Sequence, residues 1–232
     1  GGVKVLALVA SEKKYVSNLL DKFNYKKEYS KSGITIYKCD YKNHEFLIVT
    51  TGYGKVNIGS SLMYLLCNYD IRVLVSVGTA GSISNNNDIF SCIIPNNTLQ
   101  FDVDFMPNGY KEAMIPLLDN SLYKANDDLV LCANEACMKC MVNYSNDIIT
   151  SSDMYVSNNS LANSIRSSYN AGAVDCESAC VGEFSYINKI AYVSIKVVSN
   201  YANNNGIKQY NLYDDEASVI DQKIVYLSLI HI

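Results

Sequence analysis

The sequence predicts an α/β fold, a three-layer sandwich with a mixed, mostly parallel central sheet. Short apolar runs rich in Val, Ile and Leu alternate along the chain with segments of helical spacing. The runs are apolar at successive positions, which is typical of strands that helices cover on both faces. The chain has 232 residues and shows no internal repeat or linker, so we expect a single domain over residues 1–232.

The first half of the chain predicts two helices among four strands. The strands are the β-rich runs at residues 3–9, 34–39, 46–51 and 73–77. A polar turn separates the second and third runs, so these two should form a hairpin. Helical spacing predicts a first helix through Tyr15, Leu19, Leu20 and Phe23. The second helix should carry on one face Val56, Gly59, Met63 and Leu66.

The second half of the chain continues the alternation of strands and helices. Further strands are expected at residues 89–94, 99–103, 147–150, 171–174 and 191–198. Further helices are expected at residues 129–141, 161–169, 177–187 and 215–229. The last helix begins with acids, which suit a helix N-terminus. Its expected apolar face consists of Val219, Ile220, Ile224 and Leu227.

Composition and charge exclude two classes of partner. The net charge is −4, and among the 19 basic residues only Arg72 and Arg166 are arginines, so no basic stripe is available for nucleic acid. No apolar run approaches the ~18 residues of a membrane span. The first residues also lack the layout of a signal peptide. We therefore expect no nucleic-acid partner and no membrane association.

The eight cysteines predict a reduced, cytoplasmic protein. Several lie in apolar stretches, where a free thiol behaves as a small hydrophobe. Cys137 and Cys140 have the spacing of a redox or zinc pair, but no second pair accompanies them. The only histidines, His44 and His231, are distant in sequence. We expect no metal site and no cofactor.

Four polar or glycine-rich segments follow predicted strands, at residues 78–81, 151–156, 174–178 and 199–202. Ligands of such folds bind where the carboxyl ends of the strands meet, so these segments should converge on one pocket. Each segment alone also has an ordinary structural interpretation. Glycines form turns, an acid such as Glu177 opens a helix, and Tyr155 fits an apolar core.

Five segments in order resemble motifs of one family. They are Val3-Lys-Val-Leu-Ala-Leu-Val-Ala10, Thr51-Gly-Tyr-Gly-Lys-Val-Asn57, Gly78-Thr-Ala-Gly81, Phe101-Asp-Val-Asp104 with Gly109-Tyr110, and Val174-Asp-Cys-Glu-Ser178. Over almost its whole length the chain resembles the purine nucleoside phosphorylase and nucleosidase superfamily, most closely the methylthioadenosine/S-adenosylhomocysteine nucleosidases. The resemblance implies an enzyme that hydrolyses the N-glycosidic bond of a purine nucleoside.

The resemblance implies three catalytic positions. Glu177 matches the ribose-binding glutamate, whose ionised carboxylate stabilises an oxocarbenium-like cation. Asn200 stands where the nucleosidases have an aspartate that protonates the purine, and an amide donates a hydrogen bond but no proton. An ungapped comparison places Lys14 where a glutamate helps to activate water, which leaves Glu12 as the nearest acid for that role.

The resemblance also implies a set of substrate-binding residues, namely Thr79, Ala80, Gly81, Tyr155, Val156, Cys176, Lys196 and Ser199. The first three should lie near the ribose, and Tyr155 with Val156 should enclose the base. Cys176 replaces a methionine beneath the sugar, and Lys196 replaces an arginine. Ser199 should orient the neighbouring amide. The trimeric phosphorylases that act on 6-oxopurines also have an asparagine at the position of Asn200. Inosine and guanosine are therefore alternatives to adenine nucleosides as substrates.

Two alternatives to hydrolysis remain. A phosphate-dependent phosphorylase would need basic residues at the pocket, and Arg72 and Arg166 are misplaced, although Lys13 and Lys14 could hold phosphate as point charges. A nucleoside-binding protein with a degenerate site is the other. Retention of Glu177 argues against it, because a buried carboxylate without a task costs stability.

The resemblance of the segment from Phe101 to Tyr110 to its counterpart in relatives implies a homodimer. In relatives this segment reaches across the dimer and closes the neighbour's pocket. Its apolar residues, Phe101, Phe105, Met106 and Pro107, could serve that way or only pack an interface.

Overall fold

The computed structural model describes residues 4–31 and 33–230, so Val3, the expected start of the first strand, lies outside the described residues. The strands are β1 (Lys4–Ala10), β2 (Asn24–Lys31), β3 (Ile34–Tyr41), β4 (His44–Thr50), β5 (Asp70–Ser82), β6 (Cys92–Ile93), β7 (Asn97–Gln100), β8 (Tyr123–Lys124), β9 (Tyr144–Ser145), β10 (Ile148–Ser151), β11 (Ala171–Asp175) and β12 (Ala191–Tyr201). The helices are α1 (Ser17–Leu20), α2 (Lys55–Asn68), α3 (Asp127–Cys140), α4 (Asn159–Tyr169), α5 (Ser178–Asn188) and α6 (Gly206–Leu229), with the 3₁₀ helices η1 (Lys13–Tyr15) and η2 (Met106–Asn108).

One mixed sheet contains these strands, in the order β2-β3-β4-β1-β5-β11-β10-β7-β8, with β12 also paired to β5. Parallel pairings join β5 to β1 and β12, and β10 to β11 and β7. Antiparallel pairings occur mainly at the two ends, between β2, β3 and β4 and between β7 and β8. The predicted mixed α/β fold is confirmed, and the single domain over 1–232 stays a prediction.

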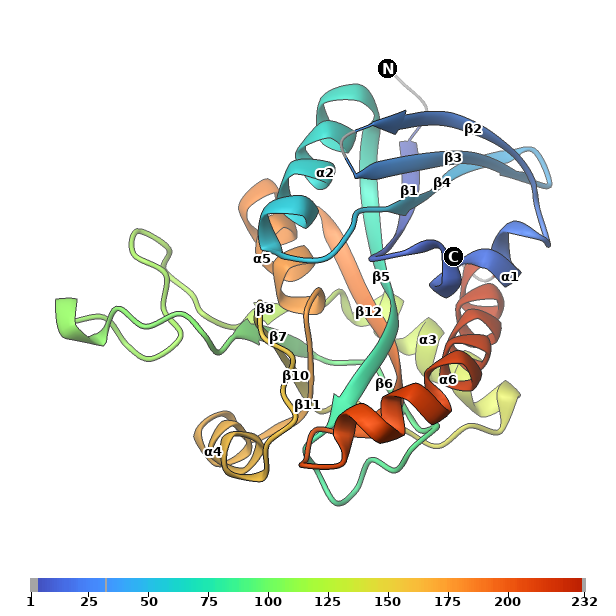
Figure 1. Ribbon diagram of the computed structural model, residues 1–232. Helices are drawn as coiled ribbons and strands as arrows, with labels where there is room; N and C mark the ends of the chain where they lie inside the picture. The colour runs from blue at the N-terminus through green and yellow to red at the C-terminus, as the bar shows by residue number, and fades with distance from the viewer. Residues whose placement is uncertain (1–3, 32, 231–232) are drawn as a thin grey trace.

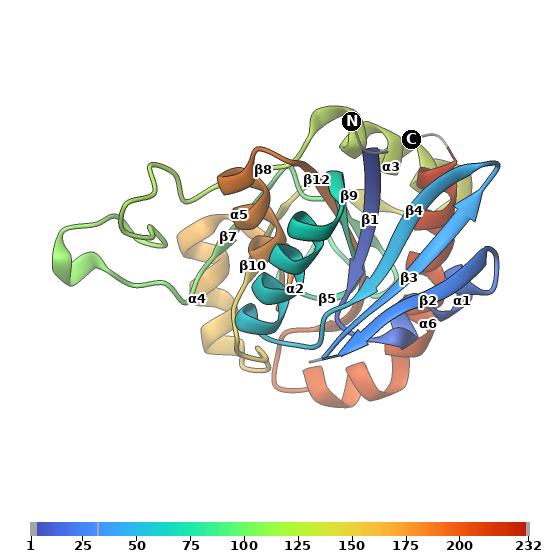
Figure 2. The ribbon, with the colours of Figure 1, turned by 90° about the horizontal axis from the view of Figure 1, so that it is seen from above.

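Helices cover both faces of the sheet (Figure 1). The α2 helix packs with α5 on one face, and α3 packs with α6 on the other. Figure 2 shows the strands between these two layers. Within the described ranges, no helix combines the length and the apolarity that a membrane crossing requires.

The N-terminal region differs from its predicted form. Tyr15, Leu19, Leu20 and Phe23 are buried as expected, but they belong to η1, the short α1 and the turn after it. The strand β2 was not predicted, because its residues are polar and mostly exposed and show no apolar alternation. It forms by pairing with β3, which supplies the backbone partners. Where the local sequence pattern is weak, pairing with a neighbouring strand therefore determines the secondary structure.

The buried face of α2 is not the predicted one. Val56 is 80% exposed and Met63 is 47% exposed. The residues that α2 buries are Ile58, Ser61, Leu62 and Leu65. Both rows are apolar at helical spacing, and the row with Ile58 and Leu62 is the one that fills the core. Val56 and Met63 of the predicted row therefore remain as an exposed apolar strip, while Gly59 and Leu66 are half-buried.

The last helix and one strand also differ in extent. The α6 helix begins at Gly206, well before the predicted Asp215. Its predicted face is only partly right, because Ile224 is buried but Val219 is 52% exposed. The run at 89–94 contributes only the two residues of β6 to the sheet.

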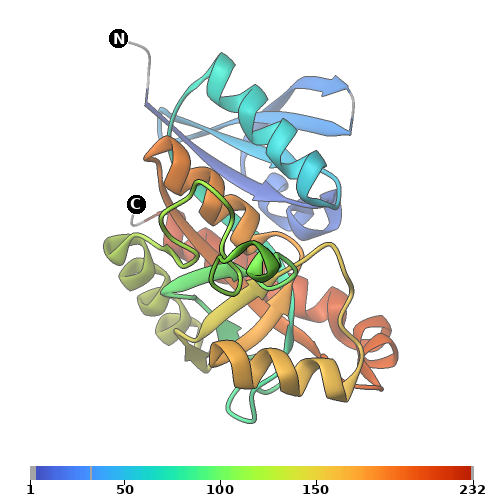
Figure 3. The same cartoon turned by 90° about the vertical axis from the view of Figure 1, so that its left-hand side faces the viewer.

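A long segment between β7 and β8 projects from the body of the molecule (Figures 1 and 2), and Figure 3 shows it end-on. This arm, residues 101–122, includes η2 and exposes Phe105 and Met106. An ion pair anchors its base, since the Lys55 ammonium lies 2.5 Å from the Asp102 carboxylate. The other oxygen of Asp102 accepts from the backbone N–H of Asp153, at 3.2 Å.

Candidate active site

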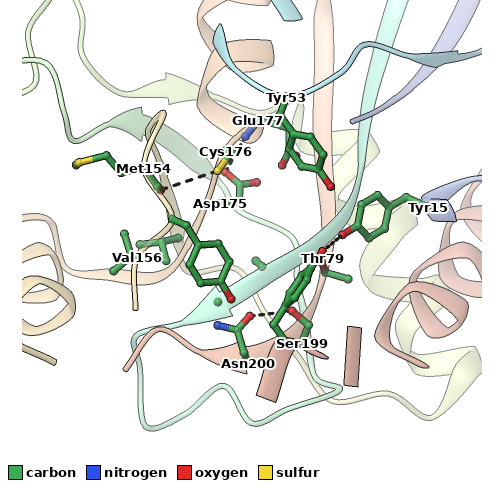
Figure 4. A pocket seen from close by; sticks show the side chains of 15 residues that line it. Tyr15, Tyr53, Thr79, Met154, Val156, Asp175, Cys176, Glu177, Ser199 and Asn200 are labelled. Atoms are coloured by element: carbon green, nitrogen blue, oxygen red, sulfur yellow. Dashed lines mark hydrogen bonds between the residues drawn. The ribbon is translucent and has the colours of Figure 1, made fainter. Parts of the chain in front are cut away.

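A cavity of about 250 Å³ opens where the carboxyl ends of β5, β10, β11 and β12 meet (Figure 4). Nine of the residues that we singled out line it: Thr79, Ala80, Gly81, Tyr155, Val156, Cys176, Glu177, Ser199 and Asn200. The predicted convergence of the four segments on one pocket is therefore found. Lys196 and Glu12 do not line the cavity but contact residues that do.

A buried cation holds the carboxylate at the cavity wall. The Lys196 ammonium lies 3.3 Å from Glu177 Oε2 and 3.6 Å from Asp175 Oδ2, and its side chain has no exposed surface. Burial alone would lower the pKa of Lys196, but the charges of Glu177 and Asp175 outweigh it and raise that pKa. Burial raises the pKa of Glu177 above its usual 4.5, while the Lys196 charge opposes the rise.

The backbone at Gly78 makes room for this cation. Gly78 has φ +139°, and a side chain there would meet the Lys196 ammonium at 3.4 Å. The ammonium donates to the carbonyl oxygen of Val77 at 3.1 Å. Behind it, the Asp221 carboxylate accepts from the backbone N–H of Gly78 at 2.8 Å. Burial raises the pKa of Asp221 well above its usual value, although Lys196 opposes the rise.

Asp175, which our sequence analysis did not single out, fixes the start of α5. Its carboxylate accepts from the backbone N–H of Ser178 at 3.2 Å and from the Ser151 hydroxyl at 2.5 Å. An acid at the start of a helix is also favoured by the helix dipole. Glu177 is thereby held one residue before the first turn of α5, with its side chain at the cavity.

Asn200 is held at the opposite end of the cavity. The Ser199 hydroxyl donates to Asn200 Oδ1 at 2.9 Å, and Asn200 Nδ2 donates to the carbonyl oxygen of Tyr201 at 3.1 Å. The residue is only 4% exposed. A side chain at Gly81 would meet Asn200 Nδ2 at 3.1 Å, so the glycine permits this close approach. The predicted bond between Ser199 and the amide is present.

Tyrosines that the sequence analysis did not assign to the site form the remaining wall. Tyr15, Tyr53 and Tyr210 line the cavity from η1, the loop before α2 and the first turns of α6. Tyr155 meets Tyr210 edge to face, with ring centroids 5.9 Å apart. Burial raises the pKa of Tyr155 to about 12, so its hydroxyl stays protonated at neutral pH.

The acid and the base of the first loop lie behind this wall. Glu12 Oε1 accepts from the Tyr53 hydroxyl at 2.5 Å. The Lys14 ammonium donates to the Tyr210 hydroxyl at 3.0 Å and lies 2.6 Å from the Asp214 carboxylate. Lys14 is therefore already paired.

The comparisons with known proteins agree with this fold. A sequence model described as Phosphorylase superfamily matches residues 4–224. The chain belongs to this superfamily. It is 23% identical to a 5'-methylthioadenosine/S-adenosylhomocysteine nucleosidase of Buchnera aphidicola over 98% of this chain and 95% of that protein.

Two solved structures from Helicobacter pylori have the same fold as this chain. The Helicobacter futalosine hydrolase has a TM-score of 0.94 at 17% identity, covering 99% of both chains. A nucleosidase variant with one aspartate changed to asparagine, with 5'-methylthioadenosine in its active site, has a TM-score of 0.93 at 16% identity and covers 100% of both chains.

Proposed function

We propose that this protein hydrolyses the N-glycosidic bond of a purine nucleoside, releasing the free base and a ribosyl product. The observation that supports it most is the buried carboxylate of Glu177 at the cavity, fixed by Lys196 and facing the same cavity as the Asn200 amide. Bond cleavage develops positive charge on the ribose, and an ionised carboxylate at that point stabilises it. The relative of Buchnera carries the same activity in its name.

The lining residues divide between the two parts of a nucleoside. Glu177 would bind the ribose hydroxyls, with Cys176 beneath the sugar and Thr79 to Gly81 beside it. Tyr155 and Val156 would enclose the base, whose edge would meet Asn200. Each of these assignments stays a proposal, supported by a common cavity.

Asn200 is compatible with two classes of purine base. An amide can both donate and accept, so it can bind a 6-amino or a 6-oxo purine. The Helicobacter variant shows that an aspartate-to-asparagine change in that nucleosidase is compatible with methylthioadenosine in the active site. We propose that Asn200 occupies the corresponding position, where it binds the base without protonating it.

The positions of Arg72, Arg166 and Lys14 favour hydrolysis over phosphorolysis, because none of the three is placed to bind a phosphate ion in the cavity. Arg72 lies near the start of β5, at the end opposite Gly78, and pairs with Asp70. Arg166 lies on α4 and does not line the cavity. Lys14 is paired with Asp214, so it is not a ready phosphate ligand.

Base release distinguishes the candidate functions. The protein is incubated with methylthioadenosine, S-adenosylhomocysteine, adenosine, inosine and guanosine, each with and without phosphate, and free base is quantified by chromatography. We expect release without phosphate. Release only with phosphate would establish a phosphorylase, and binding without release would establish a nucleoside-binding protein.

We also propose a cytoplasmic homodimer that serves purine salvage. All eight cysteines are unpaired, as in a reduced compartment. The projecting arm exposes Phe105 and Met106, and the groove at its base is lined by Ile115, Phe184 and Ile187. A second copy that covers these residues would place its own arm near this chain's cavity.

A further inference from the structure

Behind the cavity wall lies a buried carboxylate that the roles above do not use. Asp214, on the third turn of α6, is 3% exposed and lies directly behind Thr79, Tyr15 and Tyr210. Glu12, the acid expected to activate water, is instead 45% exposed at its side chain and contacts the cavity only through Tyr53. The ribose side of the cavity thus has a different carboxylate nearby.

Three donors fix the orientation of Asp214. Its Oδ2 atom lies 2.6 Å from the Lys14 ammonium and accepts from the Tyr15 hydroxyl at 3.0 Å. Its Oδ1 atom accepts from the Thr79 hydroxyl at 2.5 Å. Burial lowers the pKa of Lys14, but its hydrogen bonds to Asp214 and Tyr210 outweigh this effect and raise it, so the lysine stays charged.

The bond from Thr79 determines what its hydroxyl can do. A threonine hydroxyl has one proton and two acceptor lone pairs. Because the proton points to Asp214, the oxygen can only accept from a molecule in the cavity. Thr79 lines the cavity with Glu177 and adjoins Tyr15 there (Figure 4).

We propose that Asp214 is a positioning residue for the attacking water, acting through Thr79. This inference rests on the proposed hydrolysis. Water attacks the anomeric carbon while the bond to the base breaks and its electron pair leaves with the base. The water proton passes to the Thr79 oxygen, and the Thr79 proton passes to Asp214 Oδ1. Asp214 then releases its proton to solvent, and the base takes one up from solvent.

The test compares three substitutions with a matched control, using the nucleoside that the wild-type protein cleaves fastest among the five named above. We expect Asp214→Asn to lower kcat about 100-fold or more, with KM within about threefold, because general-base assistance contributes on this scale. Thr79→Val should lower kcat similarly, and Thr79→Ser should restore it. Asp215→Asn, an exposed neighbour on α6, should leave both constants unchanged.

The double variant separates a relay from two independent contributions. If Asp214 acts through Thr79, Asp214→Asn combined with Thr79→Val loses no more kcat than either alone. Multiplied losses, or a kcat of Asp214→Asn within about fivefold of wild type, would overturn the inference. A rise in KM with unchanged kcat would assign Asp214 a structural role and overturn it as well.

The outcome for the wild-type protein separates this inference from the proposed function. If no nucleoside yields free base without phosphate, the proposed hydrolysis fails, and the inference fails with it. If the wild-type protein hydrolyses a nucleoside and Asp214→Asn does so equally, only the inference fails. Should Asp214→Asn not fold, as judged by circular dichroism, the Thr79→Val and Thr79→Ser pair decides the question.

Discussion

The ammonium group of Lys196 lies 3.3 Å from the carboxylate of Glu177, and the lysine side chain has no exposed surface. Desolvating an ion is unfavourable by several kcal/mol, so each of these charges depends on the other. Asp175 at 3.6 Å adds a second carboxylate to the same cation. The carboxylate that we propose binds the ribose is thus also part of the buried charge balance of the fold.

Replacing Lys196 with methionine should destabilise the protein. The change leaves two buried carboxylates without their cation, and breaking a buried pair in this way costs about 3–5 kcal/mol. Urea unfolding would measure the loss, with Lys124→Met, an exposed lysine in an ion pair, as the control. A loss below about 1 kcal/mol for Lys196→Met would show that the carboxylates do not need the cation.

On acidification, activity should fall at a pH higher than the usual pKa of a glutamate. Glu177 must be ionised to stabilise the ribosyl cation, and burial raises its pKa above 4.5. The acid limb of kcat/KM should therefore lie above pH 4.5. Glu177→Gln should lower kcat about 100-fold or more and remove the limb. Glu135 is exposed, so Glu135→Gln is the control. If Glu177→Gln keeps the same acid limb, the limb reports the titration of another group.

Asp221 should make stability depend on pH. Its pKa in the folded protein is raised, so the folded state binds a proton more readily than the unfolded state. The stability that this proton supplies is present below the unfolded value of 3.8 and is lost as pH rises through the folded pKa. Asp221→Asn should therefore show a flatter melting temperature from pH 4 upward. An identical slope in both proteins would contradict this sign.

Asn200→Asp should raise activity on adenine nucleosides. A carboxylic acid at this position can protonate the leaving base, which the amide cannot do, and such assistance is worth about 10²-fold or more. Steady-state kinetics with methylthioadenosine and inosine would show a gain for the first and little for the second. Asn205→Asp, an exposed position, controls for the added charge. No gain would mean that Asn200 does not contact the base or that another group protonates it.

The parts of the site that follow strands were predictable, and the parts that come from α6 were not. Gly78 and Glu177 follow apolar runs that predict buried strands. Neighbouring parallel strands end at the same edge of a sheet, so the residues that follow them lie close together. Tyr210 and Asp214 lie in a polar stretch without apolar periodicity, so the helix there is not visible in the sequence. The pairing of Asp214 with Lys14 depends on tertiary packing of distant segments.

The misassigned face of α2 shows a second limit. Apolar spacing finds an amphipathic helix but does not say which of two apolar rows meets the core. Val56 and Met63 remain on the surface of α2, the helix that packs beside α5. An exposed apolar strip of this kind is typical of an interface.

Placing a charge on the α2 and α5 surface should therefore dissociate the proposed dimer. Ile187 is 54% exposed and lines the groove at the base of the arm, so Ile187→Glu would bury a carboxylate if a second copy covers it. Met141→Glu is the control, because Met141 is 92% exposed at the end of α3, on the other face of the sheet. Sedimentation should show half the wild-type mass for Ile187→Glu only. Its nucleosidase activity should fall too, because each cavity would lose the arm that we propose the neighbour contributes. A wild-type protein that sediments as a monomer, or a dimeric Ile187→Glu, would contradict the proposed interface.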